Sequence, residues 1–157
     1  MIPTFTVPES LHYIVEHHKA FIEKVCAAEL VYTLKNEEGY VSSACNLMED
    51  DEGVPYDKMC FWSDKALAES CMVAEWQDCR VDMIPLSTFI ESWCIGMSSE
   101  GLIAGTEASA EGIGFEIDPL ELILELAAQL EHTGKSIQLE KFKDINELVQ
   151  QIKDILS

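Results

Sequence analysis

The sequence predicts a single α+β domain, in which a mixed, mostly antiparallel sheet has about five helices packed against it. The 157 residues are enough for one domain and hardly enough for two. Apolar residues make up 48% of the chain, and they recur at helical steps in some stretches and at strand-like steps in others. No repeat, low-complexity tract or linker interrupts residues 1–157. Residues 135–157 are predicted to form a C-terminal strand–helix extension of this domain.

The first third of the chain predicts one helix followed by strands. Gly39 ends the short polar loop of a hairpin, at a place where a positive φ is usually required. The acidic run at 49–53 is predicted to be a solvated loop. The predicted elements are a helix over 11–26 and strands over 30–34, 40–44 and 58–62.

A helix is expected after the strand at 58–62. Ser63 offers a hydroxyl as its N-cap, with Asp64 and Lys65 in the first turn, and the apolar spacing continues to about Glu75. A strand follows at 80–84. The strand–helix–strand segment from 58 to 84 is therefore expected to form a right-handed parallel crossover.

The second half repeats this alternation. Thr88 and Glu91 are predicted to form a capping box in a helix that carries Leu86, Phe89, Ile90, Trp93 and Met97. Asp118 and Pro119 form a strong helix start, and that helix should stop at Gly134. The other predicted elements are strands at 102–106, 113–117 and 137–139, and a last helix capped by Asp144 with Glu147.

Net charge excludes two classes of partner. The chain has 29 acidic and 10 basic residues, which gives a formal charge of −19. Nucleic-acid binding needs a cationic stripe, and an anionic membrane surface would repel this chain, so neither is expected. A basic protein or a cation could be attracted, and the simpler alternative is an ordinary soluble protein that its charge keeps apart from its neighbours. No stretch predicts a signal peptide or a membrane span, and the predicted location is the cytoplasm.

No residue pattern predicts a cofactor or metal site. The six cysteines lack C-x-x-C spacing, and buried, reduced thiols are the expected state. His12 and Glu16 are four apart on one helix and could share an ion, but the sequence shows no supporting residues that would orient such ligands. His18 lies on the apolar stripe and is expected to be a hydrogen-bonded core histidine. The Gly112-Ile113-Gly114 sequence opens a strand rather than a helix, so it predicts a turn and not a phosphate loop.

Aromatic residues supply the candidate binding site. Large aromatic side chains at these spacings are most simply core. The alternative is that Trp62, Ser63, Asp64 and Lys65, at a strand-to-helix turn, lie at the edge of a binding surface. The full candidate set is Trp62, Ser63, Asp64, Lys65, Trp76 and Trp93. No catalytic residues are predicted.

Six short pieces of the sequence, spread in order over about residues 13–131, form a recognisable set. They are LKNEEG at 34–39, FWSDKA at 61–66, EW at 75–76, FIESW at 89–93, GLI at 101–103 with Gly105, and PLEL at 119–122. Together they resemble a bacterial family known as domain of unknown function 2750. This resemblance implies a small bacterial cytosolic α+β protein, and it brings no activity or catalytic residues. The strand–helix ending has a weaker likeness to the enhanced-serine-sensitivity proteins (SseB type).

Three functions fit the sequence. A non-enzymatic protein-interaction module leads, because motifs for chemistry are missing while acidic charge and aromatic residues are abundant. A narrower version is an immunity-like inhibitor of a basic toxin, since high charge steers a cationic partner. The third is an enzyme whose active site gathers scattered groups, such as Cys60, Asp64 and a histidine.

Overall fold

The strands form two sheets, and most neighbouring strands are antiparallel. The computed structural model describes residues 9–157, with side chains from residue 12 onward. Among the described strands, β4 and β6 form the only parallel pair. One sheet has the order β2-β1-β5, with β1 Leu30–Asn36, β2 Gly39–Tyr40 and β5 Arg80–Pro85, and the other has the order β3-β4-β6-β7, with β3 Ser42–Glu49, β4 Pro55–Phe61, β6 Ile103–Thr106 and β7 Phe115–Ile117.

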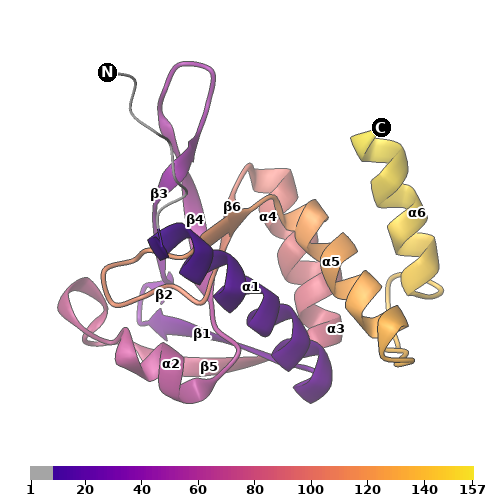
Figure 1. Cartoon of the computed structure of the whole chain (residues 1–157), viewed down its shortest axis with the longest axis horizontal. Helices are drawn as coiled ribbons and strands as arrows, with labels where there is room; N and C mark the ends of the chain where they lie inside the picture. Colours follow the sequence, from indigo (N-terminus) through magenta and orange to yellow (C-terminus); the bar gives the residue numbers. More distant parts are fainter. Residues whose placement is uncertain (1–8) are drawn as a thin grey trace.

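The described part of the chain has five helices, as the sequence predicts, and the last of them, α6, packs on α5 rather than on a sheet (Figure 1). A 3₁₀ turn lies at Ala74–Trp76. The third helix is continuous but contains a π-helical stretch in its middle. The helices are α1 Glu9–Ala28, α2 Lys65–Ser70, the helix made of α3 Leu86–Thr88, the π-helix η2 Phe89–Cys94 and α4 Ile95–Glu100, then α5 Pro119–His132 and α6 Ile145–Leu156.

The larger core lies where α1, α5 and the η2 helix meet the sheets (Figure 1). Phe21 and Val25 from α1 and Leu126 from α5 are fully buried there. His18 is buried as predicted, with Nδ1 2.8 Å from Thr106 Oγ1 and Nε2 2.6 Å from Glu125 Oε1. A second, smaller core lies under α2, around Trp62.

The predicted strand at 40–44 is divided between the two sheets. Tyr40 pairs with Lys35 in the first sheet, whereas Ser42 pairs with Met59 in the second. The chain changes sheets at Val41, whose N–H still donates to the carbonyl of Leu34 at 3.0 Å. The hairpin prediction is therefore right for Tyr40 and wrong from Ser42 onward, and Gly39, predicted in the loop, is the first residue of β2.

The predicted parallel crossover from 58 to 84 is wrong. β4 and β5 belong to different sheets, and β5 lies antiparallel to β1 over six residue pairs. The helix between them also ends at Ser70 rather than near Glu75. The separate sheets meet instead at a bridge between Tyr32 and Trp62, whose main chains exchange hydrogen bonds of 2.9 and 2.8 Å.

The N-cap of α2 is Asp64, and not Ser63 as predicted. The Asp64 carboxylate accepts the N–H of Ala66 at 2.7 Å, and helical residues begin at Lys65. Ser63 is buried and faces Glu107, which accepts its N–H at 2.6 Å and its hydroxyl at 2.8 Å. The Ser63 hydroxyl, which the sequence pattern assigns to the N-cap, thus donates to the carboxylate of Glu107 instead.

Asp64→Ala should lower the free energy of unfolding by about 1 kcal/mol, the usual loss of an N-cap. Asp64→Asn should lose much less, because an asparagine side chain also accepts a hydrogen bond in this position. Urea denaturation of both variants measures the difference. Equal losses in the two variants would contradict the assignment of Asp64 as the cap.

Two predictions around the π-helix are also wrong. Thr88 lies inside the helix, and Glu91 makes no capping box with it. The buried carboxylate of Glu91 accepts the main-chain N–H groups of Glu140 and Lys141 at 2.9–3.0 Å. The segment that includes 137–139 forms no strand, and these hydrogen bonds fasten it to the helix instead. Asp144 does cap α6, as predicted.

A β-hairpin arm made of β3 and β4 rises out of the molecule (Figure 1). At its base Lys58 and Glu116 form a buried ion pair of 2.8 Å, and each side chain is only 1% exposed. Glu116 also accepts the N–H groups of Asn46, Leu47 and Met48 at 2.6–3.1 Å. Burial alone would raise the pKa of Glu116, but the hydrogen bonds from Lys58 and from the main chain outweigh burial and lower it.

Candidate functional site

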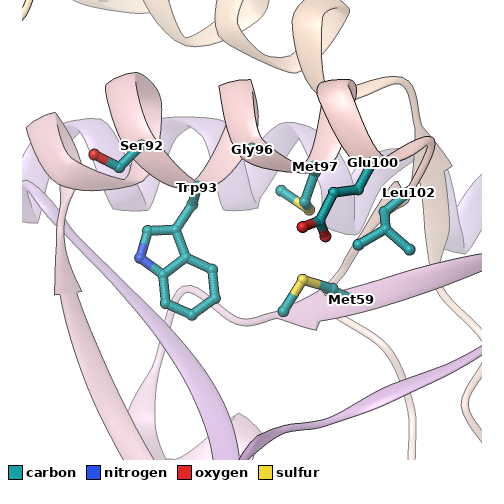
Figure 2. A pocket seen from close by; sticks show the side chains of 7 residues that line it. All are labelled: Met59, Ser92, Trp93, Gly96, Met97, Glu100 and Leu102. Carbon is teal, nitrogen blue, oxygen red and sulfur yellow. The ribbon is translucent and has the colours of Figure 1, made fainter.

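A groove runs along the helix that contains η2, beside β4 (Figure 2). Its volume is about 260 Å³. Trp93 projects from the helix into this space, and Met59 faces it from β4. We call this hollow the Trp93 groove. Its lining is Met59, Ser92, Trp93, Gly96, Met97, Glu100 and Leu102.

The π-helix helps to place Trp93 at this opening. A π-helical stretch widens the helix and shifts the side chains on either side of it relative to each other, and such stretches are frequent at functional sites. In η2, Phe89, Ile90 and Cys94 point into the core while Trp93 is only half-buried. The α4 segment then carries Gly96, which has no side chain to fill the groove.

Aromatic neighbours hold the Trp93 ring in place. Its centroid lies 4.5 Å from Tyr40 and 5.8 Å from Phe61, both in edge-to-face geometry, which is favourable for such pairs. The Tyr40 hydroxyl donates to Asp82 at 2.8 Å, and Lys35 lies 3.5 Å from the same carboxylate. Partial burial, together with Asp82, raises the pKa of Tyr40. The Trp93 indole is therefore packed against Tyr40 and Phe61.

The groove combines apolar walls with one carboxylate. Met59, Met97 and Leu102 supply thioether and aliphatic surface, and methionine adapts easily to different partners. Glu100 is exposed, and its carboxylate points over the opening (Figure 2). Such a site fits an aliphatic chain that ends in a positive charge, which can also lie against the Trp93 ring.

The structure separates the three tryptophans predicted as site residues. Trp62 is fully buried, and its Nε1 donates to the carbonyl of Ala108 at 2.9 Å, which agrees with the core interpretation. Trp76 is half-buried, packs edge-on to Trp62 at 6.1 Å, and lines a hollow that it shares with Tyr40. Tyr40 therefore links the surroundings of Trp76 to the Trp93 groove.

Ser63, Asp64 and Lys65 do not belong to this groove. Ser63 and Asp64 are engaged in the contacts described above, with Glu107 and with the N-terminus of α2. Lys65 is exposed as the first residue of α2. Ser63, Asp64 and Lys65 instead form the turn and the first residue of α2.

The groups named for an enzyme are each engaged elsewhere. Cys60 is fully buried, and burial raises the pKa of its thiol to about 11, so it is a weak nucleophile at neutral pH. His18 has both ring nitrogens within hydrogen-bond distance of Thr106 and Glu125. Asp64 caps α2. All six cysteines are buried and free.

The sequence analysis names Trp93 as a candidate but none of the other residues that line the groove. Gly96, Met97 and Glu100 follow Trp93 at steps of three, four and seven residues, so helical spacing carries a signal for this face. Met59 comes from a strand more than 30 positions earlier, and nothing local in the sequence predicts that contact.

A family model described as protein of unknown function (DUF2750) matches residues 18–126 of the chain. The chain belongs to this family. The resemblance inferred from the sequence is thereby confirmed, and every residue of the Trp93 groove lies within the DUF2750 match. Residues 127–157, which include α6, lie outside it.

Other comparisons add no relative of known function. No curated protein and no solved structure matches this DUF2750 chain. The likeness of the ending to the enhanced-serine-sensitivity proteins therefore has no support from them. Within the described residues, no helix is both long and apolar enough to cross a membrane.

Proposed function

We propose that this DUF2750 protein is a non-enzymatic module that binds a basic segment of another protein in the Trp93 groove. The observation that carries the proposal is the juxtaposition of Trp93, Met59 and Met97 with the exposed carboxylate of Glu100. A lysine or arginine side chain matches it, since the aliphatic stem would cover the apolar walls and the charged end would meet Glu100.

The charge of the whole chain favours the same partner. A formal charge of −19 accelerates encounter with a basic protein and repels nucleic acid and anionic lipid, so we expect neither of these to bind. A location in the bacterial cytoplasm, where the thiols stay reduced, is part of this proposal.

A basic toxin is a narrower version of the partner. The charge of −19 would steer the protein to such a toxin at a high rate, as an immunity protein requires. Gene neighbourhood discriminates between the two versions: a toxin gene next to this one favours the inhibitor, and housekeeping neighbours favour a general module.

The groove is tested with a fluorescein-labelled octapeptide of alternating lysine and leucine. In fluorescence anisotropy at physiological salt, Trp93→Ala should weaken binding about tenfold or more, because a buried aromatic anchor carries much of an interface's affinity. Glu100→Gln should weaken binding up to about fivefold, the effect of one exposed ion pair.

Glu23→Gln is the matched control for charge. It makes the same charge change at an exposed position on α1, away from the groove lining, and it should leave the affinity unchanged. If Glu23→Gln weakens the peptide as much as Glu100→Gln does, the peptide senses only the overall charge and the groove proposal is wrong.

A further inference from the structure

The β3–β4 arm exposes apolar side chains that the rest of the protein does not cover. Leu47 is 67% exposed, Val54 54% and Tyr56 38%. Val54 and Tyr56 lie in and just after the turn that joins β3 to β4, and Leu47 lies on β3, where its N–H donates to Glu116. Figure 1 shows that the outer part of this hairpin stands clear of the body. Exposed apolar side chains gathered on a projecting element are typical of a protein contact.

The same arm is strongly acidic. Glu49, Asp50, Asp51, Glu52 and Asp57 lie on it, and residues 43–57 contain no lysine, arginine or histidine. A second copy of this chain, with the same charge of −19, would be repelled by this surface. Charge complementarity therefore favours a basic protein as the occupant.

The arm is also rigid at both ends, which lowers the entropy cost of binding. At the tip, the Asp50 carboxylate accepts the N–H groups of Glu52 and Val54 at 2.8 and 3.0 Å. At the base, Glu116 and Lys58 fix the bulged strand through the hydrogen bonds described above. These contacts fix the main chain that carries the exposed side chains before any partner arrives.

We infer that the β3–β4 arm is an insertion element that enters a basic, apolar-floored cleft of another protein. Leu47, Val54 and Tyr56 would contact the floor of that cleft, while the carboxylates on either side would face its basic rim. This surface goes beyond the proposed function, since it is separate from the Trp93 groove, although both surfaces call for a basic partner. β4 connects them, because it contains both Tyr56 and Met59.

Site-specific photo-crosslinking tests the arm in cells of the source organism. The full chain carries p-benzoylphenylalanine at Leu47, at Tyr56 or, as control, at Ile155, which is 68% exposed on α6. Leu47 and Tyr56 should crosslink to the same basic protein, through peptides that line a cleft, and Ile155 should not. Crosslinks to copies of this chain, to a neutral or acidic protein, or to none would overturn the inference.

Purified components then separate the arm from the groove. With the crosslinked partner, Leu47→Ser and the pair Asp51→Asn with Glu52→Gln should each weaken binding about tenfold without lowering the melting temperature, since these side chains are exposed. If only Trp93→Ala weakens binding, the arm inference fails and the groove survives. If only the arm variants do, the groove proposal fails instead.

Discussion

Replacing Lys58 with methionine is expected to lower the free energy of unfolding by about 3–5 kcal/mol, the cost of leaving a buried partner charge unpaired. The Lys58 ammonium contacts Glu116 at 2.8 Å and the carbonyl of Gly112 at 2.9 Å, in a site closed to solvent. Methionine fills a similar volume but removes the charge that Glu116 faces. Urea denaturation at neutral pH measures the loss.

Two further variants check the cause. Lys58→Met combined with Glu116→Gln should be more stable than Lys58→Met alone, because the buried site then holds no unpaired charge. Lys19→Met removes an exposed lysine that lies 3.7 Å from Glu16, and it should cost less than about 0.5 kcal/mol. A loss below about 1 kcal/mol for Lys58→Met would contradict the buried-pair interpretation.

The pH dependence of stability should report the same pair. Because the pKa of Glu116 is lowered in the folded protein, its stabilising effect is complete above the unfolded value of 4.5 and is lost as pH falls through the folded pKa. In Lys58→Met this loss at acid pH should shrink. Glu107 has the opposite effect on stability. Burial raises its pKa despite the hydrogen bonds from Ser63, so its ionisation lowers the stability of the folded protein as the pH rises.

Trp62→Ala should cost about 3–5 kcal/mol, the usual loss on truncating a buried tryptophan. The ring is fully buried at the junction of the two sheets, and its truncation also leaves the Ala108 carbonyl without the indole N–H. A thermal melt and urea denaturation measure the effect together.

Trp76→Ala serves as the comparison, because its ring packs on Trp62 but is only half-buried, and it should cost clearly less. An unchanged melting temperature for Trp62→Ala would mean that the ring is not part of the core. Equal losses in the two variants would mean that burial does not set the size of the effect.

Elements with local signals were predicted well. Asp118 and Pro119 start α5, and Asp144 caps α6. The last residue of α5 is His132, two positions before the predicted stop at Gly134. In these cases the residues that satisfy the free N–H groups lie within one turn of the helix that they cap. A short window of sequence therefore contains the whole interaction.

Elements that depend on distant partners were predicted poorly. Ser63 and Asp64 are both competent caps, and the choice between them depends on Glu107, more than 40 residues away. The change of sheet at Val41 depends on which strands pair with Gly39-Tyr40 and Ser42, and those partners are not neighbours of the segment. The segment at 137–139 alternates like a strand, but no free strand edge pairs with it, and Glu91 binds the main chain just beyond it.

The π-helical stretch from Phe89 to Cys94 has a genetic consequence. A π-helix arises when one residue is inserted into an α-helix, so a single codon separates the two forms of this helix. Removing one residue from the stretch would return it to a regular α-helix, in which the segments before and after it keep their orientations and only the widened turn is lost. The turn that carries Trp93 would then be narrower. Substitutions can change the chemistry of this surface gradually, but a one-codon deletion removes the widened turn in one step.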